Sequence, residues 1–342
     1  MIVLTDKSCY EQAVHFAFKQ HIQRIPKDIQ LNYFLHPDGE KSFNEVTGQK
    51  HFYNSLLNLI WQIFSNPDSK IFSPNAILTI LCLPAIILKR KKVVTWVQGI
   101  MAEESYLKHN SKIKYYILSF LEYIAIKMSY STIVVTDEMK VYLENKYNIK
   151  LKRSITVPCT SRFKLFDSEQ EKKRNSFLYL GGVSAWQCLD KVIIAFNSIK
   201  KLNQDANLTI ITTGVEQAEK LVKAYDKTDS VAILKITDPK LLEEEIKKFE
   251  FGFLIREDIP VNHVASPIKL AEYLSCGLSI ITTKALKGYA SKLEKSKVSI
   301  IIDIDQLENL PVQFQHNSLT SVELYKEIFI NPTTNLDYRS LW

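Results

Sequence analysis

Short apolar runs rich in β-branched residues alternate with longer amphipathic segments along the whole chain. Runs of this kind predict strands, and the segments between them predict helices, such as those at 54–64 and 112–128. The predicted strands lie at 30–35, 70–73, 92–99, 131–137, 176–182, 207–214, 230–236, 249–258, 278–283 and 298–303. Because parallel strands need a crossover connection, which is usually a helix, this alternation favours parallel sheets.

The order of these runs predicts an α/β protein with two Rossmann-like domains that face a central cleft. We expect an N-terminal domain over residues 1–165 and a C-terminal domain over residues 166–325. Residues 326–342 should form a C-terminal segment that packs back towards the first domain. A chain of 342 residues can bury two ordinary cores, and 46% hydrophobic with 24% charged residues is an ordinary balance for a globular protein.

The five cysteines are scattered, odd in number and without a Cys-x-x-Cys pair, so they read as reduced core residues of a cytosolic protein. No histidine pairs with a cysteine or another histidine at the spacing of metal ligands. The sequence also lacks a Walker loop, a Gly-x-Gly-x-x-Gly fingerprint and a nucleophile elbow. We therefore expect no metal and no other cofactor, and we expect no nucleic-acid partner.

An apolar run at 74–88 is too short to span a bilayer and is interrupted by Pro84, so it predicts a core helix. The basic run at 89–92 follows it, and the first 150 residues carry 18 Lys and Arg against 13 Asp and Glu. This excess fits either a solvated basic turn or peripheral contact with an anionic membrane. The first residues break their apolar run at Asp6 and lack a basic start, so a signal peptide is not expected. The expected location is the cytoplasm, free or at the inner face of the cytoplasmic membrane.

The segment 264–277, with the sequence VASPIKLAEYLSCG, predicts a short helix with both ends specified. Ser266 can cap the first free N–H groups, and Pro267 has its φ already set for the first helical position. Gly277 can adopt the left-handed conformation that ends a helix. The helix is therefore expected to begin and end at defined residues.

Leu270 and Leu274 fall on the apolar side of this predicted helix, whereas Lys269 and Glu272 fall on the other side. A lysine and a glutamate three residues apart are often only a solvated ion pair. The strand at 249–258 precedes this helix, however, and ligands in open α/β sheets lie beyond the carboxyl ends of strands, beside helix N-termini. The pattern therefore predicts an anion site with Glu272 one turn deeper.

The stretch REDIPVNHVASPIKLAEYLSCGLSIITT, residues 256–283, resembles the donor-site signature of GT-B glycosyltransferases. It is most similar to the retaining family 4 and its relatives in bacterial surface-polysaccharide synthesis. The resemblance implies an N-terminal acceptor domain and a C-terminal nucleotide-sugar domain. It also implies that the helix N-terminus at Ser266 and Pro267 faces the donor diphosphate and that Glu272 holds the ribose hydroxyls.

Gly181 and Gly182 follow a predicted strand and precede a helix, so backbone there could approach a phosphate closely. The corresponding loop of the family brings an arginine and a lysine to the diphosphate, but this chain has Gly182 and Gln187 instead. Lys269 and Arg256 then become the candidate cations, and a monophosphate donor stays open. Further residues that we expect at the donor site are Ser184, Gly214, Lys235 and Asn262.

The family commonly has two glutamates separated by seven residues, and this chain has Val264 eight positions before Glu272. Only the ribose-binding half of the motif is present. Asn262, Arg256 or Asp258 is expected to take over the missing contacts with the sugar. The alternative for Arg256 is a surface ion pair with a neighbouring carboxylate.

The stretch TWVQGIMAEES, residues 95–105, predicts a buried strand that is followed by Gly99 and then by the glutamates Glu103 and Glu104. It resembles the loop that supplies an active-site histidine in many family members, but Gln98 stands there. Gln98 can hydrogen-bond a sugar hydroxyl and cannot act as a base at neutral pH. Glu103 or Glu104 could act as a base, or both could simply be acidic residues favoured in the first turn of a helix.

The resemblance implies a hexosyltransferase-like enzyme that moves a sugar from a nucleotide-sugar donor to a hydroxyl of a glycan or a lipid-linked glycan. Its setting would be the synthesis of bacterial capsule, lipopolysaccharide or another surface polysaccharide, with retained configuration and no metal. The triplet Asp303–Asp305 resembles a metal-binding motif of a different glycosyltransferase fold and is not expected to bind metal here. Two alternatives are a sugar-nucleotide epimerase of the same fold and a catalytically inactive nucleotide-sugar-binding protein.

Overall fold

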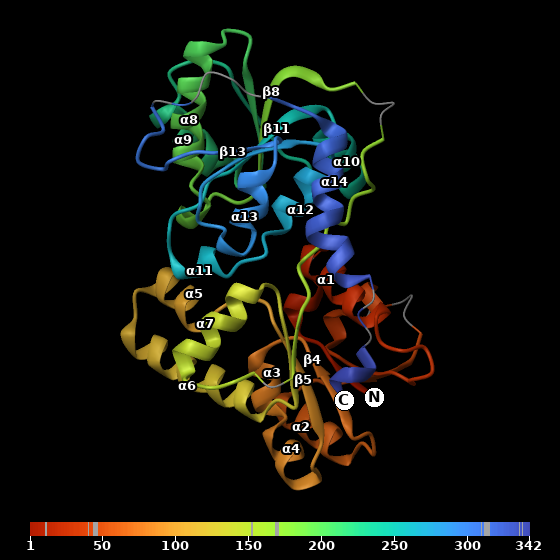
Figure 1. Cartoon of the computed structure of the whole chain (residues 1–342). Helices are drawn as coiled ribbons and strands as arrows, with labels where there is room; N and C mark the ends of the chain where they lie inside the picture. Colours follow the sequence, from red (N-terminus) through yellow and green to blue (C-terminus); the bar gives the residue numbers. More distant parts are fainter. Residues whose placement is uncertain are drawn as a thin grey trace. The chain divides into compact units, whose positions relative to one another are not determined.

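The computed structural model divides into two compact α/β units, one of residues 1–158 and 333–342 and one of residues 159–332 (Figure 1). The structure describes the chain except for residues 11, 40, 44–46, 152, 168–170, 309, 311–314, 335 and 337. Both units are built on all-parallel sheets, so the predicted α/β class with two Rossmann-like units is confirmed.

Within its described residues, the first unit has one sheet of seven parallel strands in the order β3-β2-β1-β4-β5-β6-β7. The strands are β1 (Ile2–Leu4), β2 (Asn32–Leu35), β3 (Gln49–Phe52), β4 (Lys70–Ser73), β5 (Lys92–Val97), β6 (Ser131–Val134) and β7 (Ser154–Thr156). The central strands are apolar on both faces and buried, as a sheet covered by helices requires. The strand order reverses between β1 and β4, which makes the carboxyl end of this part of the sheet a natural ligand edge.

The helices of this unit are α1 (Gln12–Gln23), α2 (Leu56–Ser65), α3 (Ala76–Leu81), α4 (Leu83–Lys89), α5 (Met101–His109), α6 (Lys112–Met128) and α7 (Asp137–Tyr147). Ser55, Ser111 and Thr136 cap the N-termini of α2, α6 and α7 with their side-chain oxygens. The single helix predicted over the apolar run is wrong, because the chain breaks at Cys82 and Pro84 enters the first turn of α4.

In the described part of the second unit, six parallel strands follow the order β10-β9-β8-β11-β12-β13. They are β8 (Lys173–Leu180), β9 (Asn207–Ile211), β10 (Val231–Leu234), β11 (Phe249–Leu254), β12 (Ser279–Thr282) and β13 (Ser299–Ile301). The helices are α8 (Leu189–Leu202), α9 (Val215–Tyr225), α10 (Pro239–Ile246), α11 (Pro260–His263), α12 (Ile268–Ser275), α13 (Lys287–Lys295) and α14 (Ser318–Tyr325). Two apolar clusters cover the two faces of the sheet, one of which includes the stacked rings of Phe177 and Phe251.

The boundaries of the units differ from the predicted ones by a few residues. The first unit ends at Pro158, because Phe163 and Phe166 already pack into the second unit against the α12 region. The chain returns to the first unit at Thr333, because Phe329 still belongs to the core of the second unit. The last residues are then held in the first unit by a 2.6 Å hydrogen bond between His21 and Tyr338.

None of the helices in the described ranges is both long and apolar enough to cross a bilayer.

Candidate functional site

The candidate donor site lies where the strand order of the second sheet reverses, between β8 and β11. β8 ends at Leu180, and β11 ends at Leu254, so the loops that follow them meet at the same edge of the sheet. Tyr273 ties α12 to this edge, because its buried hydroxyl accepts a 2.7 Å hydrogen bond from the backbone N–H of Leu180. The side chains carried by α12 are thereby fixed beside the loop after β8.

Gly181 has a φ of +143°, in a region that residues with side chains rarely adopt. A Cβ atom there would lie 1.7 Å from Nζ of Lys269, so the lysine ammonium lies directly over this backbone. Gln187 accepts a hydrogen bond from the same Nζ through Oε1, and the ring of Tyr179 lies 5.2 Å below it. Gln187 therefore does not replace the missing cation, but it positions Lys269, which supplies one.

Arg256 comes directly after β11 and is buried. Its Nη1 donates to the carbonyl oxygens of Gln187, at 3.3 Å, and Ile255, at 3.0 Å. Thr283 fixes the arginine backbone, since its hydroxyl donates to the Arg256 carbonyl at 2.6 Å and accepts from the Arg256 N–H. Burial lowers the pKa of the guanidinium, because a charged group loses solvation there.

The alternative of a surface ion pair for Arg256 is wrong, because both neighbouring carboxylates have other partners. Glu257 pairs with Lys191 at 2.7 Å, and Asp258 pairs with His263 and Lys287. Arg256 thus directs its charge towards the loop that holds Gln187.

Glu272 and Lys269 are one turn apart on α12, and both are withdrawn from solvent. Glu272 pairs with Arg162, whose Nε lies 3.1 Å from Oε1. Burial raises the pKa of Glu272 to about 7, and the charges of Arg162 and Lys269 oppose this shift. The pKa of Lys269 lies well below its ordinary value, first because of burial and then because of the positive charge of Arg256. The solvated Lys269–Glu272 ion pair considered from the sequence is therefore wrong.

Arg162 and Lys269 lie close enough to Glu272 to influence its carboxylate, and Arg256 lies close enough to Lys269 to influence its ammonium. Among the described residues, neither Lys269 nor Arg256 has a carboxylate oxygen within 4.0 Å, and Arg162 is the ion-pair partner of Glu272. Cations that are desolvated and not neutralised are costly to hold, and an anionic ligand would relieve that cost. The site is therefore chemically suited to phosphate.

The N-terminus of α12 differs from the prediction. The helix begins at Ile268, with Pro267 in the capping position and no side-chain cap. Ser266 is not the N-cap, because its hydroxyl accepts hydrogen bonds from the Cys159 N–H at 3.0 Å and from the Tyr289 hydroxyl at 2.6 Å. Gly277 has a φ of +73° after the end of the helix, as predicted.

The remaining predicted donor residues lie at different distances from this centre. Gly214 packs against the glycine loop, since a Cβ there would lie 2.9 Å from Val183. Ser184 precedes the short turn that carries Gln187 and makes no capping bond. Asn262 is buried and donates to the Glu257 carbonyl at 2.9 Å. Lys235 is exposed after the edge strand β10, away from the other residues.

Arg162 is the site residue that the sequence did not reveal. It lies 110 positions before Glu272, in a loop without a recognisable motif. A basic residue shortly after the last strand of the first unit was the only available signal.

The first unit has a cavity of about 420 Å³ at the carboxyl end of β5. Six of its polar lining residues are Asn75, Gln98, Glu104, Ser105, Lys108 and His109. Gln98 is fixed by a 2.9 Å hydrogen bond from Nε2 to the Pro74 carbonyl. The cavity therefore joins an oriented amide to a carboxylate and to basic side chains.

The Glu104 carboxylate lies against the backbone just after the end of β5, because a Cβ on Gly99 would lie 1.9 Å from its Oε1. Burial raises the pKa of Glu104, and the negative charges of Glu122 and Glu103 act in the same direction, whereas Lys108 opposes them. A cavity-lining carboxylate whose pKa is raised is a candidate for general acid–base chemistry.

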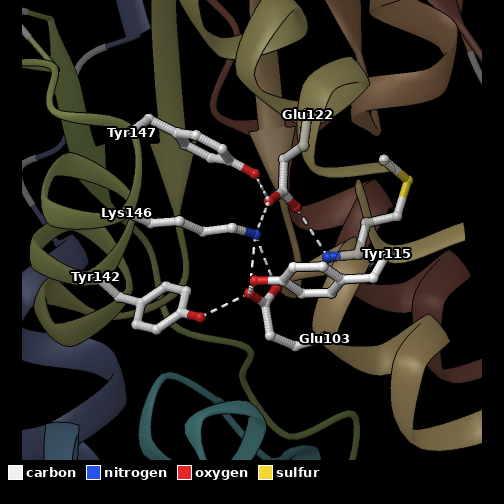
Figure 2. Close-up of polar contacts among 7 residues, drawn as sticks. Glu103, Tyr115, Glu122, Tyr142, Lys146 and Tyr147 are labelled. Carbon is white, nitrogen blue, oxygen red and sulfur yellow. Dashed lines mark hydrogen bonds and ion pairs between the residues drawn. The ribbon is translucent and has the colours of Figure 1, made fainter. Parts of the chain in front are cut away.

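Glu103 does not line the cavity, although it is the neighbour of Glu104 in sequence. Its carboxylate is occupied by the Tyr142 hydroxyl at 2.7 Å, the Tyr115 hydroxyl at 3.2 Å and Lys146 at 2.9 Å (Figure 2). This carboxylate holds α5 against α6 and α7, so of the two glutamates predicted as candidate bases only Glu104 lines the cavity.

Glu122 completes this cluster from α6. It accepts from Lys146 at 3.2 Å, from the Tyr147 hydroxyl at 2.5 Å and from the Met101 N–H at 2.8 Å (Figure 2). One lysine thus pairs with the buried Glu122 and with the partly exposed Glu103, and the Glu122 carboxylate anchors the N-terminus of α5 beside the cavity.

No group of three histidine, cysteine, aspartate or glutamate side chains that could hold a metal ion occurs among the residues for which the structure gives positions.

The two parallel sheets and the phosphate-suited edge agree with one known family. Residues 161–310 match the family model described as glycosyl transferases group 1. This region, somewhat less than half of the chain, is therefore similar to group 1 glycosyl transferases. It contains every candidate donor residue of the second unit, including Arg162. No curated protein matches the chain in sequence.

Solved structures extend the similarity beyond the matched residues 161–310 to the whole chain. The galactosyltransferase WaaB of the lipopolysaccharide outer core gives a TM-score of 0.67 at 13% identity, over 99% of this chain and 98% of WaaB. HepE of Anabaena, in complex with UDP, gives 0.65 at 10% identity over 99% and 96%. TarM of S. aureus, in a complex that includes UDP, gives 0.61 at 10% identity over 85% of this chain. The chain spans 58% of the length of TarM. These proteins are GT-B glycosyltransferases, and at such identities they show that this chain has the GT-B fold.

Proposed function

We propose that the chain transfers a sugar from a nucleotide-sugar donor to a hydroxyl of a glycan or a lipid-linked glycan. The observation that carries the proposal is the pair of basic side chains, the buried Arg256 and the half-buried Lys269, that have no carboxylate partner among the described residues and lie at the ligand edge of the region similar to group 1 glycosyl transferases. Lys269 and Arg256 would bind the donor phosphates, and the Gly181 backbone leaves room for their approach. Both cations would then stabilise the negative charge on the departing nucleotide.

Glu272 would bind the ribose hydroxyls of the donor. Its carboxylate is buried and fixed by Arg162, so it can accept hydrogen bonds in a defined direction. Two relatives of the same fold were solved with UDP, which makes uridine nucleotides the first donors to test.

The acceptor would bind in the cavity of the first unit. Gln98 would hydrogen-bond a sugar hydroxyl, and Glu104 would accept the proton of the hydroxyl that attacks the donor. A reaction with retained configuration and without a metal is part of the proposal, because the sequence resembles the retaining family.

The proposed setting is surface-polysaccharide synthesis in the cytoplasm, at the inner face of the membrane. The lipopolysaccharide role in the name of WaaB supports this setting, as does the basic excess of the first 150 residues. A protein that only binds nucleotide sugars is the second candidate, because Gln98 stands where many relatives have a histidine. An epimerase of the same fold is the third.

A thermal-shift screen of nucleotide sugars tests the proposal. A ligand at 100 times its Kd adds about 2.7 kcal/mol to the free energy of unfolding, so the correct donor should raise Tm clearly. Lys269→Met is the matched variant, because it removes a phosphate contact and leaves Glu272 in place. The proposal fails if no nucleotide sugar stabilises the protein, and the assigned site fails if Lys269→Met responds like the wild type.

A further inference from the structure

Helix α6 exposes a continuous apolar stripe. Ile113, Tyr116, Ile117 and Phe120 are 74%, 69%, 54% and 61% exposed, and their spacing places them on one face of the helix. Leu107 of the preceding helix, α5, adds to the exposed apolar surface of this helix pair. An exposed apolar stripe of this length indicates a contact site.

The charges on the exposed part of α6 are all positive. Lys112 and Lys114 are exposed at its start, and Lys127 is exposed at its end. The one acidic residue of α6, Glu122, is buried in the cluster with Lys146 (Figure 2). The outward face therefore combines large apolar side chains with lysines and carries no carboxylate.

The same cluster fixes which face of α6 points outward. Lys146 and Tyr147 of α7 hold Glu122 from inside the unit, and its other oxygen accepts the Met101 N–H of α5. Turning the stripe inward would break three polar contacts of a buried carboxylate, which is strongly unfavourable. The apolar stripe is therefore a stable feature of the surface.

In the basic run at 89–92, which the sequence offered as the membrane-facing cluster, Lys89, Arg90 and Lys92 are exposed and Lys91 is not. Lys91 is buried and donates to the backbone carbonyls of Asn66 and Asp68. Lys89 packs over the ring of Phe64, and Lys92 packs over the ring of Tyr130. The exposed lysines of α6, in contrast, lie beside an exposed apolar stripe on their own helix.

We propose that this face of α6 docks the protein on an anionic phospholipid bilayer. Negative headgroups would neutralise all three lysines, while the stripe enters the headgroup region, where a tyrosine such as Tyr116 is well accommodated. A second copy fits less well, because antiparallel pairing of two stripes would set Lys112 and Lys114 against Lys127. On the proposed function, docking would also bring a lipid-linked acceptor beside the cavity, since Leu118 of α6 lines it.

Sedimentation of the full chain with vesicles tests the proposal. Vesicles of phosphatidylglycerol with phosphatidylcholine, and of phosphatidylcholine alone, are compared at low and high salt. The wild type should bind the anionic vesicles at low salt and leave them at high salt. Each of Lys112→Gln, Lys114→Gln and Lys127→Gln should lower the partition constant about fivefold, and the triple variant about a hundredfold. The double variant Tyr116→Ser/Phe120→Ser should lower it by about tenfold or more.

The double variant Leu57→Ser/Trp61→Ser is the matched control, because it removes exposed apolar area from α2 instead. It should sediment like the wild type. The proposal is overturned if the wild type stays in the supernatant under all conditions or if only the α2 variant loses binding. It is also overturned if the α6 variants abolish a dimer in solution and leave vesicle binding unchanged. Because sedimentation needs no catalysis, its failure would leave the glycosyltransferase proposal standing, and thermal shifts with nucleotide sugars report on that proposal separately.

Discussion

Replacing Gly181 by alanine perturbs the contact between the glycine loop and the candidate phosphate-binding lysine. The glycine has a φ of +143°, and a Cβ there would lie 1.7 Å from Nζ and 2.3 Å from Cε of Lys269. Alanine must therefore accept an unfavourable backbone conformation, and the lysine must leave its position. The end of a lysine side chain is flexible, so it can move at small cost to folding, but the ammonium is lost from the site.

The two consequences have different magnitudes. The backbone conformation should lower the free energy of unfolding by about 1–3 kcal/mol, as for other residues forced into regions that favour glycine. The displaced Lys269 should weaken donor binding by about 1.5–3 kcal/mol, the range for a hydrogen bond to a charged group, which is about ten- to a hundredfold in Kd.

Urea unfolding and calorimetric titration with UDP measure these two effects. Gly182→Ala is the control next in sequence, since the nearest atom to its Cβ is Nε2 of Gln187, at 3.8 Å. It should bind UDP like the wild type. The double variant Gly181→Ala/Lys269→Ala should lose about as much free energy of unfolding as a strained backbone alone costs, because it has no lysine side chain for the new Cβ to overlap. The reasoning is refuted if Gly181→Ala binds UDP normally, or if both glycine variants lose binding equally.

Three further variants test other parts of the structure. Glu272→Gln should remove a pH dependence of the free energy of unfolding. The buried carboxyl has a pKa of about 7, whereas its ordinary pKa is 4.5. Its contribution to stability is therefore present below about pH 4.5 and lost as the pH rises through 7. Urea unfolding at pH 4.5 and at pH 7 measures this dependence. If the free energy of unfolding of Glu272→Gln changed with pH as much as that of the wild type, Glu272 would not be its source. Glu104→Gln should slow transfer by about 10²–10⁴-fold and abolish the acidic limb of the pH–rate profile, while the affinity for UDP stays constant. A transfer rate equal to that of the wild type would exclude Glu104 as the base. Lys146→Met should lower the free energy of unfolding by about 3–5 kcal/mol, because the buried Glu122 loses its cation and the partly exposed Glu103 loses the same partner. A loss below about 1 kcal/mol in urea would show that the cluster is not a stabilising unit.

Much of the fold follows from local sequence patterns. The predicted helix at 112–128 has the bounds of α6, and the strand at 70–73 has those of β4. Strand β1 and helix α1 were not predicted, since β1 has only three residues. The break between α3 and α4 could have been read from Pro84, which favours a new helix start over continuation.

The site was predictable where it depends on the order of βα units and not where it depends on distant partners. The ends of β8 and β11 bring Gly181, Gln187 and Arg256 to one edge because parallel strands share their carboxyl ends. The hydroxyl of Ser266 had the right position for a cap, but Tyr289, 23 residues later, uses it. Local sequence carries no information about such a partner.

Glu103 and Glu104 show the same limit. Both are acidic residues in the first turn of α5, so local rules treat them alike. The fold separates them, because Lys146 of α7, 43 residues after Glu103, pairs with Glu103 and not with Glu104. Glu104 is left to line the cavity.

Release of nucleotide from a bound nucleotide sugar, measured with and without a glycan acceptor, tests the proposed transfer most directly. The account predicts that UDP or another nucleotide is released only when acceptor is present, in equal amount to the glycosylated product, and that Lys269→Met suppresses the release. Conversion of the nucleotide sugar without acceptor would indicate an epimerase. Tight binding of the nucleotide sugar with no release under any acceptor would contradict the proposed transfer and leave a binding protein.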